Sequence, residues 1–354
     1  MGDIAKTYSG GTPSVTNKNF YNNGYIPFIK SGEIGSSKTE QKINNDGLNN
    51  SSAKLVKTGT LLYALYGATS GKAAISPING AINQAVLAII PQTNVNRFIY
   101  EWLNKNKPRI TEKYLQGGQG NLSAKIIKQI NIFTTSKNEE LKISDILGIV
   151  EKIISLQQRK LKLLKLMKNI VSYNLVVSHK LASNNEIKWK AVYLKDIARI
   201  YQPTTITKKD LLPKGIPVFG ANDYIGFYNK YNHETDQVTI CARGASAGHP
   251  NYVKGPVWIT GNSMVINVDE TYINKKFLYT LLTFTDLKRF VTGGAQPQIT
   301  RENLNSLKIL LPSIKAQNNL SAIIENLSIN IRKVQLSINS AKRLKQFLLQ
   351  NMFI

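Results

Sequence analysis

The sequence predicts an α+β protein in which two copies of one globular domain are joined by two long helices. Three observations predict this class. The second half of the chain repeats the first, each half opens with short strand-like runs rich in Gly, Pro, Asn and Tyr, and each half closes with a long heptad pattern. The predicted segments are 1–136 and 183–312 for the two globular domains, with helices at 137–182 and 313–354.

The internal repeat separates most equivalent positions by 177 residues, half of the 354-residue chain. Residues 67–71 (Gly-Ala-Thr-Ser-Gly) correspond to 244–248 (Gly-Ala-Ser-Ala-Gly), and the register then holds to the end of the chain. Near the start of each half the spacing is slightly larger, because 26–28 (Ile-Pro-Phe) correspond to 216–218 (Ile-Pro-Val). Loops of different length on one repeated scaffold are what two different recognition tasks require.

Strand and cap signals indicate the elements of each globular domain. Residues 60–64 and 238–242 are short apolar runs typical of strands. Ser123 and Thr300 are candidate N-caps of short helices. Each short helix is followed by an apolar run, at 130–133 and at 307–311, that we expect to be extended.

The heptad pattern predicts one long helix in each half. Apolar residues recur in steps of three and four, with skipped positions at Gln157, Lys168 and Lys345. The seam positions are Ile143, Leu147, Val150, Ile154, Leu161, Leu164, Val171 and Leu175, repeated as Leu320, Ile324, Leu327, Ile331, Ile338, Ala341, Leu348 and Met352. The skipped polar residues either fix the register of the seam or lie at its edge and extend into solvent.

Two pairings of these helices are consistent with the pattern. Each helix of roughly 35 residues is on the order of 50 Å long at 1.5 Å per residue. Paired antiparallel within one chain, the helices form a coiled coil that holds the two domains at opposite ends. A pseudo-twofold axis then relates the two halves. Paired within a dimer, they have a different arrangement.

Charge predicts a polyanionic partner. The chain has 46 Lys and Arg against 21 Asp and Glu, a formal net charge of +25. A surplus of this size favours nucleic acid, since each phosphate paired with a cation releases condensed counterions. No apolar run reaches the length of a membrane span, and we expect a cytoplasmic protein with Cys241, its one cysteine, buried in a strand.

Motifs for catalysis are missing from the sequence. Residues 67–73 resemble a phosphate-binding loop but are one residue short, and Ala73 stands where Ser or Thr binds magnesium. The chain has no Asn- or Asp-Pro-Pro-aromatic motif of an adenine methyltransferase and no acidic nuclease cluster. His179, His233 and His249 lack the spacing of zinc ligands. The sequence therefore predicts a non-catalytic chain with no metal site.

The order of motifs resembles the specificity subunits of type I restriction-modification systems, over essentially the whole chain. In that family each half has an Ile-Pro-apolar strand, a polar loop, a Gly-x-x-x-Gly turn, an Asn-containing strand, a Gln-bearing turn and a spacer helix. Here these motifs lie at 26–32, 67–71, 83–86 and 118–119, and again at 216–223, 244–248, 262–265 and 294–296. No single motif is specific, and the order repeated twice carries the resemblance.

The resemblance implies a function. Each domain is expected to be a target-recognition domain that reads one half of a bipartite, asymmetric DNA site. The helices are expected to set the distance between the two half-sites and to dock methyltransferase subunits, of which we expect two. Restriction subunits join through that complex. S-adenosylmethionine, ATP and Mg are expected only in the partner subunits, which together with this chain would form an adenine-N6 methyltransferase and ATP-dependent endonuclease. The alternative is a free-standing DNA-binding or antirestriction protein with the same architecture.

Base reading requires side chains that match base edges: Arg or Lys for guanine and Asn or Gln for adenine. We expect Gly67, Gly71, Gly244 and Gly248 to form turns rather than contacts. The candidate DNA-contacting residues are Lys30, Ser31, Tyr66, Thr69, Ser70, Lys72 and Gln119 in the first half, and Asn222, Asp223, Tyr224, Arg243, Ser246, His249, Gln296 and Gln298 in the second. For each residue the alternative is a loop-stabilising or phosphate contact.

The first half departs from the family pattern at its start. The second half opens with the run 189–194 (Trp-Lys-Ala-Val-Tyr-Leu), whereas the first begins at Met1 directly on Gly-Asp-Ile-Ala. We expect the first domain to lack the corresponding edge strand, either because the chain is truncated or because another element covers that edge.

Overall fold

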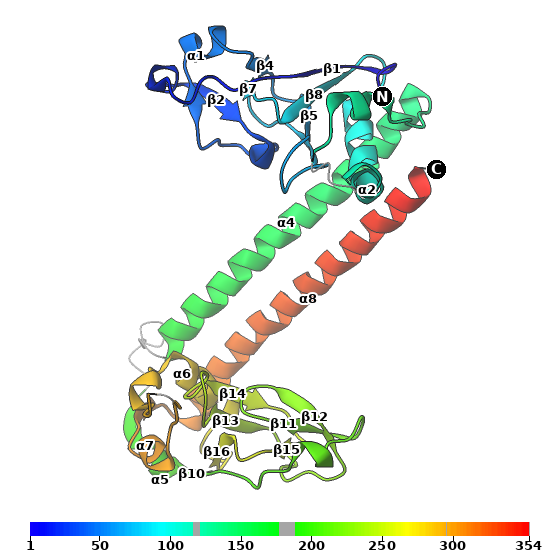
Figure 1. Cartoon of the computed structure of the whole chain (residues 1–354). Coiled ribbons are helices and arrows are strands. Elements are labelled where there is room, and N and C mark those ends of the chain that lie inside the picture. The colour runs from blue at the N-terminus through cyan, green and yellow to red at the C-terminus, as the bar shows by residue number, and fades with distance from the viewer. Residues whose placement is uncertain (116–120, 177–187, 295, 354) are drawn as a thin grey trace. The chain divides into compact units, whose positions relative to one another are not determined.

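The computed structural model describes residues 1–115, 121–176, 188–294 and 296–353, and these form two compact units. Unit 1 comprises Met1–Gln157 and Ser337–Ile354, and unit 2 comprises Gln158–Leu336. Each unit therefore contains a globular part together with one portion of helix α4 (Lys137–Val176) and one portion of helix α8 (Ile314–Met352). Both helices are continuous from end to end (Figure 1). The expected boundary between 182 and 183 lies outside the described residues.

Unit 1 contains two four-stranded sheets. The antiparallel sheet has the order β1-β8-β5-β6, and the mixed sheet has the order β3-β2-β7-β4 with β2 parallel to β7. Helix α2 packs against β5 and β6. The strands are β1 (Ala5–Ser9), β2 (Ile26–Ile29), β3 (Lys42–Ile43), β4 (Lys54–Val56), β5 (Leu61–Ala64), β6 (Ala73–Ile75), β7 (Gly80–Ile82) and β8 (Val86–Pro91), and the other helices are α1 (Asn45–Asn49), α2 (Asn96–Leu115) and α3 (Ala124–Gln129).

Unit 2 repeats this design. Its antiparallel sheet has the order β10-β16-β13-β14, a second sheet has the order β12-β11-β15 with β11 parallel to β15, and helix α6 packs against β13 and β14. The strands are β9 (Lys190–Tyr193), β10 (Ala198–Tyr201), β11 (Ile216–Phe219), β12 (Tyr224–Tyr228), β13 (Gln237–Cys241), β14 (Pro250–Val253), β15 (Trp258–Ile259), β16 (Ser263–Val268) and β17 (Lys308–Leu311), and the helices are α5 (Leu194–Ile197), α6 (Lys275–Phe284) and α7 (Arg301–Asn305). The predicted α+β class with two repeated domains and two long helices is confirmed.

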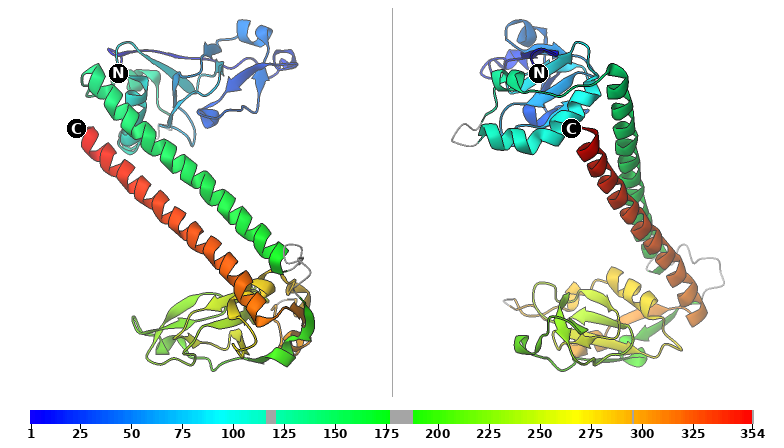
Figure 2. Two further views of the ribbon diagram at one scale, coloured as in Figure 1. Left: turned by 180° about the vertical axis from the view of Figure 1, so that it is seen from behind. Right: turned by 90° about the vertical axis from the view of Figure 1, so that its right-hand side faces the viewer.

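The heptad seam is the buried side of both long helices. Every described seam position is buried or half-buried, and Leu147 is completely buried. In unit 1 the helix portions run antiparallel, since Lys345 of α8 is paired with Glu151 of α4 while Phe353, beyond the end of α8, lines one pocket with Ile143 near the start of α4. Figure 2 shows both helices as unbroken ribbons from two further sides. The long helices thus provide apolar packing for the globular part of each unit.

The two short helices begin at the predicted caps. The Ser123 side chain accepts a hydrogen bond from the Ile126 backbone N–H at 3.2 Å, and Thr300 accepts one from Asn303 at 3.2 Å. The run 307–311 contains β17, which pairs antiparallel with β9. The run 130–133, by contrast, lies in no helix or strand, because no described strand of unit 1 corresponds to β9.

Candidate nucleic-acid interface

The Gly-x-x-x-Gly turns have the same backbone hydrogen bonds in both units. In unit 1 the turn joins β5 to β6, and the Gly71 N–H donates to the Ala64 carbonyl at 2.9 Å. In unit 2 the turn joins β13 to β14, and the Gly248 N–H donates to the Cys241 carbonyl, also at 2.9 Å. Both pairs are related by the 177-residue repeat, so the repeat extends to individual hydrogen bonds.

All four turn glycines occupy the left-handed region of backbone space. Their φ angles are +78° at Gly67, +81° at Gly71, +86° at Gly244 and +83° at Gly248. Residues with a Cβ rarely adopt this conformation, which explains why both turns retain glycine at these two places. The positions between and after the glycines differ between the two units. Thr69, Ser70 and Lys72 of unit 1 correspond to Ser246, Ala247 and His249 of unit 2.

The predicted residues of unit 1 have different environments. Lys30 and Ser31 are half-buried where β2 ends, and the Lys30 N–H donates to the Glu33 carboxylate at 3.2 Å. Lys72 is half-buried and lines a pocket of about 450 Å³ together with the loop 32–36. The structure therefore brings the β2 loop and the glycine turn to one hollow.

Three residues of the first turn are less accessible than the sequence suggested. The Ser70 side chain is buried, and its hydroxyl donates to the Leu65 carbonyl at 2.9 Å. A base contact from Ser70 requires breaking this bond, so the loop-stabilising alternative describes its observed state. Tyr66 and Thr69 are half-buried, and Tyr66 packs against the core of unit 1. Gln119 lies outside the described residues.

In unit 2 the turn lies beside a second predicted segment. Arg243 forms an isolated antiparallel bridge with Gln298, and the Gly244 N–H donates to the Pro297 carbonyl at 2.9 Å. The Arg243 carbonyl in turn accepts from the thiol of Cys241 at 3.3 Å, and Cys241 is completely buried, as predicted. The side chains of Arg243, Ser246, His249, Gln296 and Gln298 are all exposed. The structure thus places the segment 297–298 beside the start of the turn, with all five candidates accessible to solvent.

The third predicted group of unit 2 lies on its other sheet. Asn222, Asp223 and Tyr224 are exposed where β11 turns into β12. The Asp223 carboxylate accepts from the Tyr224 N–H at 2.7 Å, and the Tyr224 ring packs edge-on against Phe219 with centroids 5.2 Å apart. These contacts orient the hairpin while leaving its side chains accessible.

Sequence reasoning missed one cation beside the first turn. A methyl group placed on Gly71 would lie 3.3 Å from Cγ of Lys107 in α2, so this lysine stem runs along the turn. Lys107 stands in a polar stretch of α2 that resembles an ordinary solvated helix face, and only the packing of α2 on β5 and β6 reveals its place. Lys107 is therefore a further candidate for a phosphate contact.

Two structural features bear on other functions. Among the described residues, no group of three or more His, Cys, Asp and Glu side chains is arranged to hold a metal ion. Within the same described ranges, no helix combines the length and hydropathy needed to cross a membrane.

Sequence comparison identifies similar proteins. The family model for the type I restriction modification DNA specificity domain matches residues 1–166 and 186–340. The specificity subunit of the type I restriction enzyme EcoprrI from Escherichia coli is 23% identical over 342 residues, 90% of this chain and 84% of that protein. A putative type I restriction enzyme specificity subunit from Haemophilus influenzae is 29% identical over 155 residues, 42% of this chain and 39% of that protein.

Structural comparison identifies the same fold. The type I restriction-modification S subunit from M. genitalium aligns with a TM-score of 0.69 at 18% identity, covering 100% of this chain and 94% of that chain. A chain from a structural study of complex assembly in the type I R-M system aligns with a TM-score of 0.59 at 14% identity, covering 99% of this chain and 96% of that chain.

Proposed function

The chain belongs to the type I restriction modification DNA specificity family, and from that premise we propose that it reads a bipartite, asymmetric DNA site, one half with each unit. One observation carries this proposal: the two units present the same turn with the same backbone hydrogen bonds, but with different side chains. A constant backbone with variable side chains positions two readers alike and lets each recognise a different sequence.

The surplus of positive charge supports DNA as the partner. Lysines and arginines outside the reading surfaces hold phosphates without specifying sequence, which contributes salt-sensitive affinity. Specificity then depends on the exposed Arg243, Gln296 and Gln298 in unit 2 and on the hollow around Lys72 in unit 1.

An exposed apolar stripe on α4 supports docking of methyltransferase subunits. It is distinct from the buried seam and recurs mostly in steps of three and four, the spacing of a face that packs on another helix. Exposed fractions along it range from 40% at Ile146 to 60% at Ile149. The other members are Ile153, Leu156, Leu163, Met167 and Ile170. Large exposed apolar surfaces mark interaction sites, and we propose helices of two methyltransferase subunits as the occupants.

Catalysis in this proposal belongs to the partners. The chain supplies sequence recognition, and the assembled complex methylates adenine at N6 and cleaves DNA with ATP after restriction subunits join. S-adenosylmethionine, ATP and Mg bind in those partner subunits. The complex works in the cytoplasm, where its DNA substrate is.

The experiment that tests the function is base-resolution mapping of N6-methyladenine in host DNA with and without the gene. We expect a bipartite motif that disappears on deletion and returns when the gene is restored. A methylome that does not change on deletion would support a free-standing DNA-binding or antirestriction protein instead. In that case the purified chain would also fail to bind a methyltransferase subunit.

A further inference from the structure

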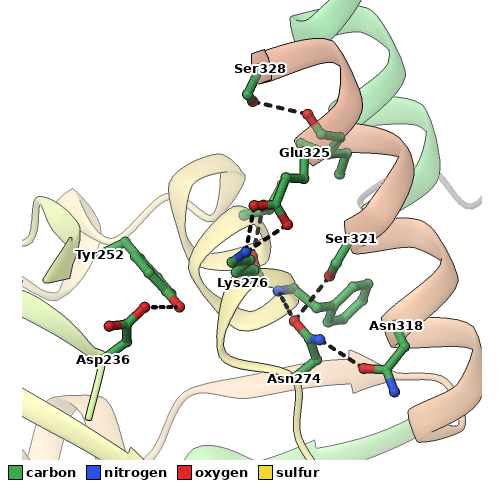
Figure 3. A network of polar contacts seen from close by, with 11 residues as sticks. Asp236, Tyr252, Asn274, Lys276, Asn318, Ser321, Glu325 and Ser328 are labelled. Carbon is green, nitrogen blue, oxygen red and sulfur yellow. Dashed lines mark hydrogen bonds and ion pairs between the residues drawn. The ribbon is translucent and has the colours of Figure 1, made fainter. Parts of the chain in front are cut away.

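Unit 2 contains a pocket of about 480 Å³ where α6 meets its portions of α4 and α8. Figure 3 shows the polar network around it, with Lys276 and Glu325 facing each other between α6 and α8. The lining residues that matter here are Lys168, Ser172, Lys254, Thr280, Ser328 and Arg332.

At the equivalent place in unit 1 the charged side chains are paired with one another. Lys345 of α8 is paired with Glu151 of α4, and its Nζ lies 3.4 Å from a carboxylate oxygen of Glu101 in α2. Arg97 pairs with the same two carboxylates. Glu101 is completely buried, so this cluster ties α2, α4 and α8 together inside unit 1.

The internal repeat relates the two places residue by residue. Lys168 and Ser328 of unit 2 lie 177 residues from Lys345 and Glu151 of unit 1. The run 97–101 (Arg-Phe-Ile-Tyr-Glu) corresponds to 276–280 (Lys-Phe-Leu-Tyr-Thr), which places Thr280 at the position of Glu101.

An independent contact supports this alignment. The Val95 N–H donates to the Glu140 carboxylate at 2.7 Å, and the Asn274 N–H donates to the Gln317 side chain at 2.9 Å, each just before the helix. Unit 2 therefore has the lysine of the cluster but has hydroxyl groups in place of both glutamates.

Two additional cations line the pocket in unit 2. The 177-residue repeat places Arg332 and Lys254 where unit 1 has Ser155 and Pro77. The two carboxylates of the pocket are already engaged. Asp236 accepts from the Tyr252 hydroxyl at 2.8 Å and from the Gly255 N–H at 3.1 Å, and Glu325 pairs with Lys276 at 2.6 Å.

Three cations of the pocket lack a carboxylate partner. No carboxylate of the described residues lies within ion-pair distance of Lys168, Lys254 or Arg332. The Ser172 side chain is only 2% exposed, and its hydroxyl has no hydrogen-bond partner within the described part of the chain. A buried hydroxyl without a partner costs free energy that a bound acceptor removes.

We propose that this pocket receives an acidic side chain from the partner protein that docks on α4. The inference rests on the proposed function, which supplies that partner. In unit 1, two carboxylates pair with the equivalent lysine where α2, α4 and α8 pack together. Tyr279, Phe284 and Ile324 give the pocket an apolar wall, which suits a protein segment better than a bare phosphate. A recess between helices also admits a protruding side chain more readily than the convex backbone of duplex DNA.

The test fills the pocket with the chain's own carboxylates. The double variant Thr280→Glu/Ser328→Glu reproduces the arrangement of unit 1, and Lys168→Met removes the central cation. The matched control Asn326→Glu/Asn330→Glu adds the same charge at exposed positions of α8 that do not line the pocket. Affinity of each full-length chain for the purified methyltransferase subunit is measured at low and high salt, with thermal unfolding as the check on folding.

We expect both pocket variants to bind the methyltransferase subunit about 10-fold more weakly at low salt, while the control binds like the parent chain. Equal binding by parent and pocket variants overturns the inference and leaves the proposed function standing. A loss of affinity for duplex DNA with no loss for the protein partner also overturns it, and assigns the pocket to phosphate. If the parent chain itself binds no methyltransferase subunit, that result contradicts the proposed docking function, and the inference about the pocket is contradicted as well.

Discussion

Lys345 near the end of the chain is paired with Glu151 of helix α4, and its ammonium group also faces the fully buried carboxylate of Glu101. Burial alone lowers the pKa of Lys345, but the hydrogen bond to Glu151 and the negative charges of Glu101 and Glu151 outweigh burial and raise it. Lys345 is therefore a charged residue at the place where α2, α4 and α8 pack together in unit 1. The sequence left open whether this seam lysine extends into solvent, and that alternative is wrong.

We expect Lys345→Met to destabilise the protein by about 2–4 kcal/mol, since it leaves Arg97 as the one remaining cation for the two carboxylates among the described residues, and one of these carboxylates is fully buried. Lys168→Met is the matched control, because Lys168 occupies the equivalent helix position and no carboxylate of the described residues pairs with it. Its effect on stability should stay below about 1 kcal/mol. Urea unfolding of the two variants gives the comparison, and equal losses would contradict the assigned role of the ion pairs.

The turn glycines predict a graded series. No atom of the described residues lies within 4 Å of a Cβ placed on Gly67 or Gly244, so alanine there costs the backbone conformation, about 1–2 kcal/mol. A methyl group on Gly71 would lie 2.7 Å from Cγ2 of Thr111, whose hydroxyl is held by the Lys107 carbonyl at 2.9 Å. Gly71→Ala should therefore cost about 2–4 kcal/mol. Thermal unfolding that ranks Gly67→Ala as equal to or worse than Gly71→Ala would contradict this packing argument.

Much of the fold could be predicted because it depends on local patterns. The buried seam follows from the 3.5-residue spacing of apolar positions, the cap at Ser123 from its hydroxyl, and the turn at Gly67 from the glycine pair. Each of these features involves residues close together in the chain, where side-chain chemistry and backbone geometry act directly.

The remainder depends on contacts between distant segments. The ion pair between Lys345 and Glu101 joins two helices that the sequence treats separately. Ser70 was a plausible reader by residue type, but its hydroxyl faces the Leu65 carbonyl because of how the turn closes on β5. The apolar run 130–133 has the composition of a strand, yet a strand also needs a neighbouring strand, and no described strand pairs with it. Whether the candidate residues contact DNA stays a prediction.

The environment of His233 predicts a loss of stability in mild acid. Its ring lies 2.8 Å from the Tyr201 hydroxyl and 2.7 Å from the Asn232 side chain, and burial, with a smaller effect of Lys275, lowers its pKa below the ordinary 6.5. As the pH falls below 6.5, the unfolded chain binds a proton that the folded chain does not, so the free energy of unfolding decreases. Above pH 6.5 this contribution to stability is fully present.

Unfolding measured about one pH unit above and one below 6.5 tests this sign. His233→Gln should reduce the difference between the two conditions, whereas His249→Gln, at an exposed position, should leave it unchanged. A His233→Gln protein with the parent's full pH dependence would assign the effect to other groups.

The strongest test of two separate readers uses Tyr66 and Arg243, which occupy equivalent positions before the two turns. Arg243 is exposed, and its backbone is held by Gln298 and by the thiol of Cys241, so Arg243→Ala should remove a base contact without unfolding unit 2. We expect a loss of about 1–3 kcal/mol in discrimination at the second half-site alone. Tyr66→Ala should act at the first half-site alone, with thermal unfolding as the control, because Tyr66 also packs against the core of unit 1. Binding to duplexes in which one half-site at a time is scrambled separates the two effects. Uniform weakening on every duplex, with a reduced salt dependence, would instead make Arg243 a phosphate contact.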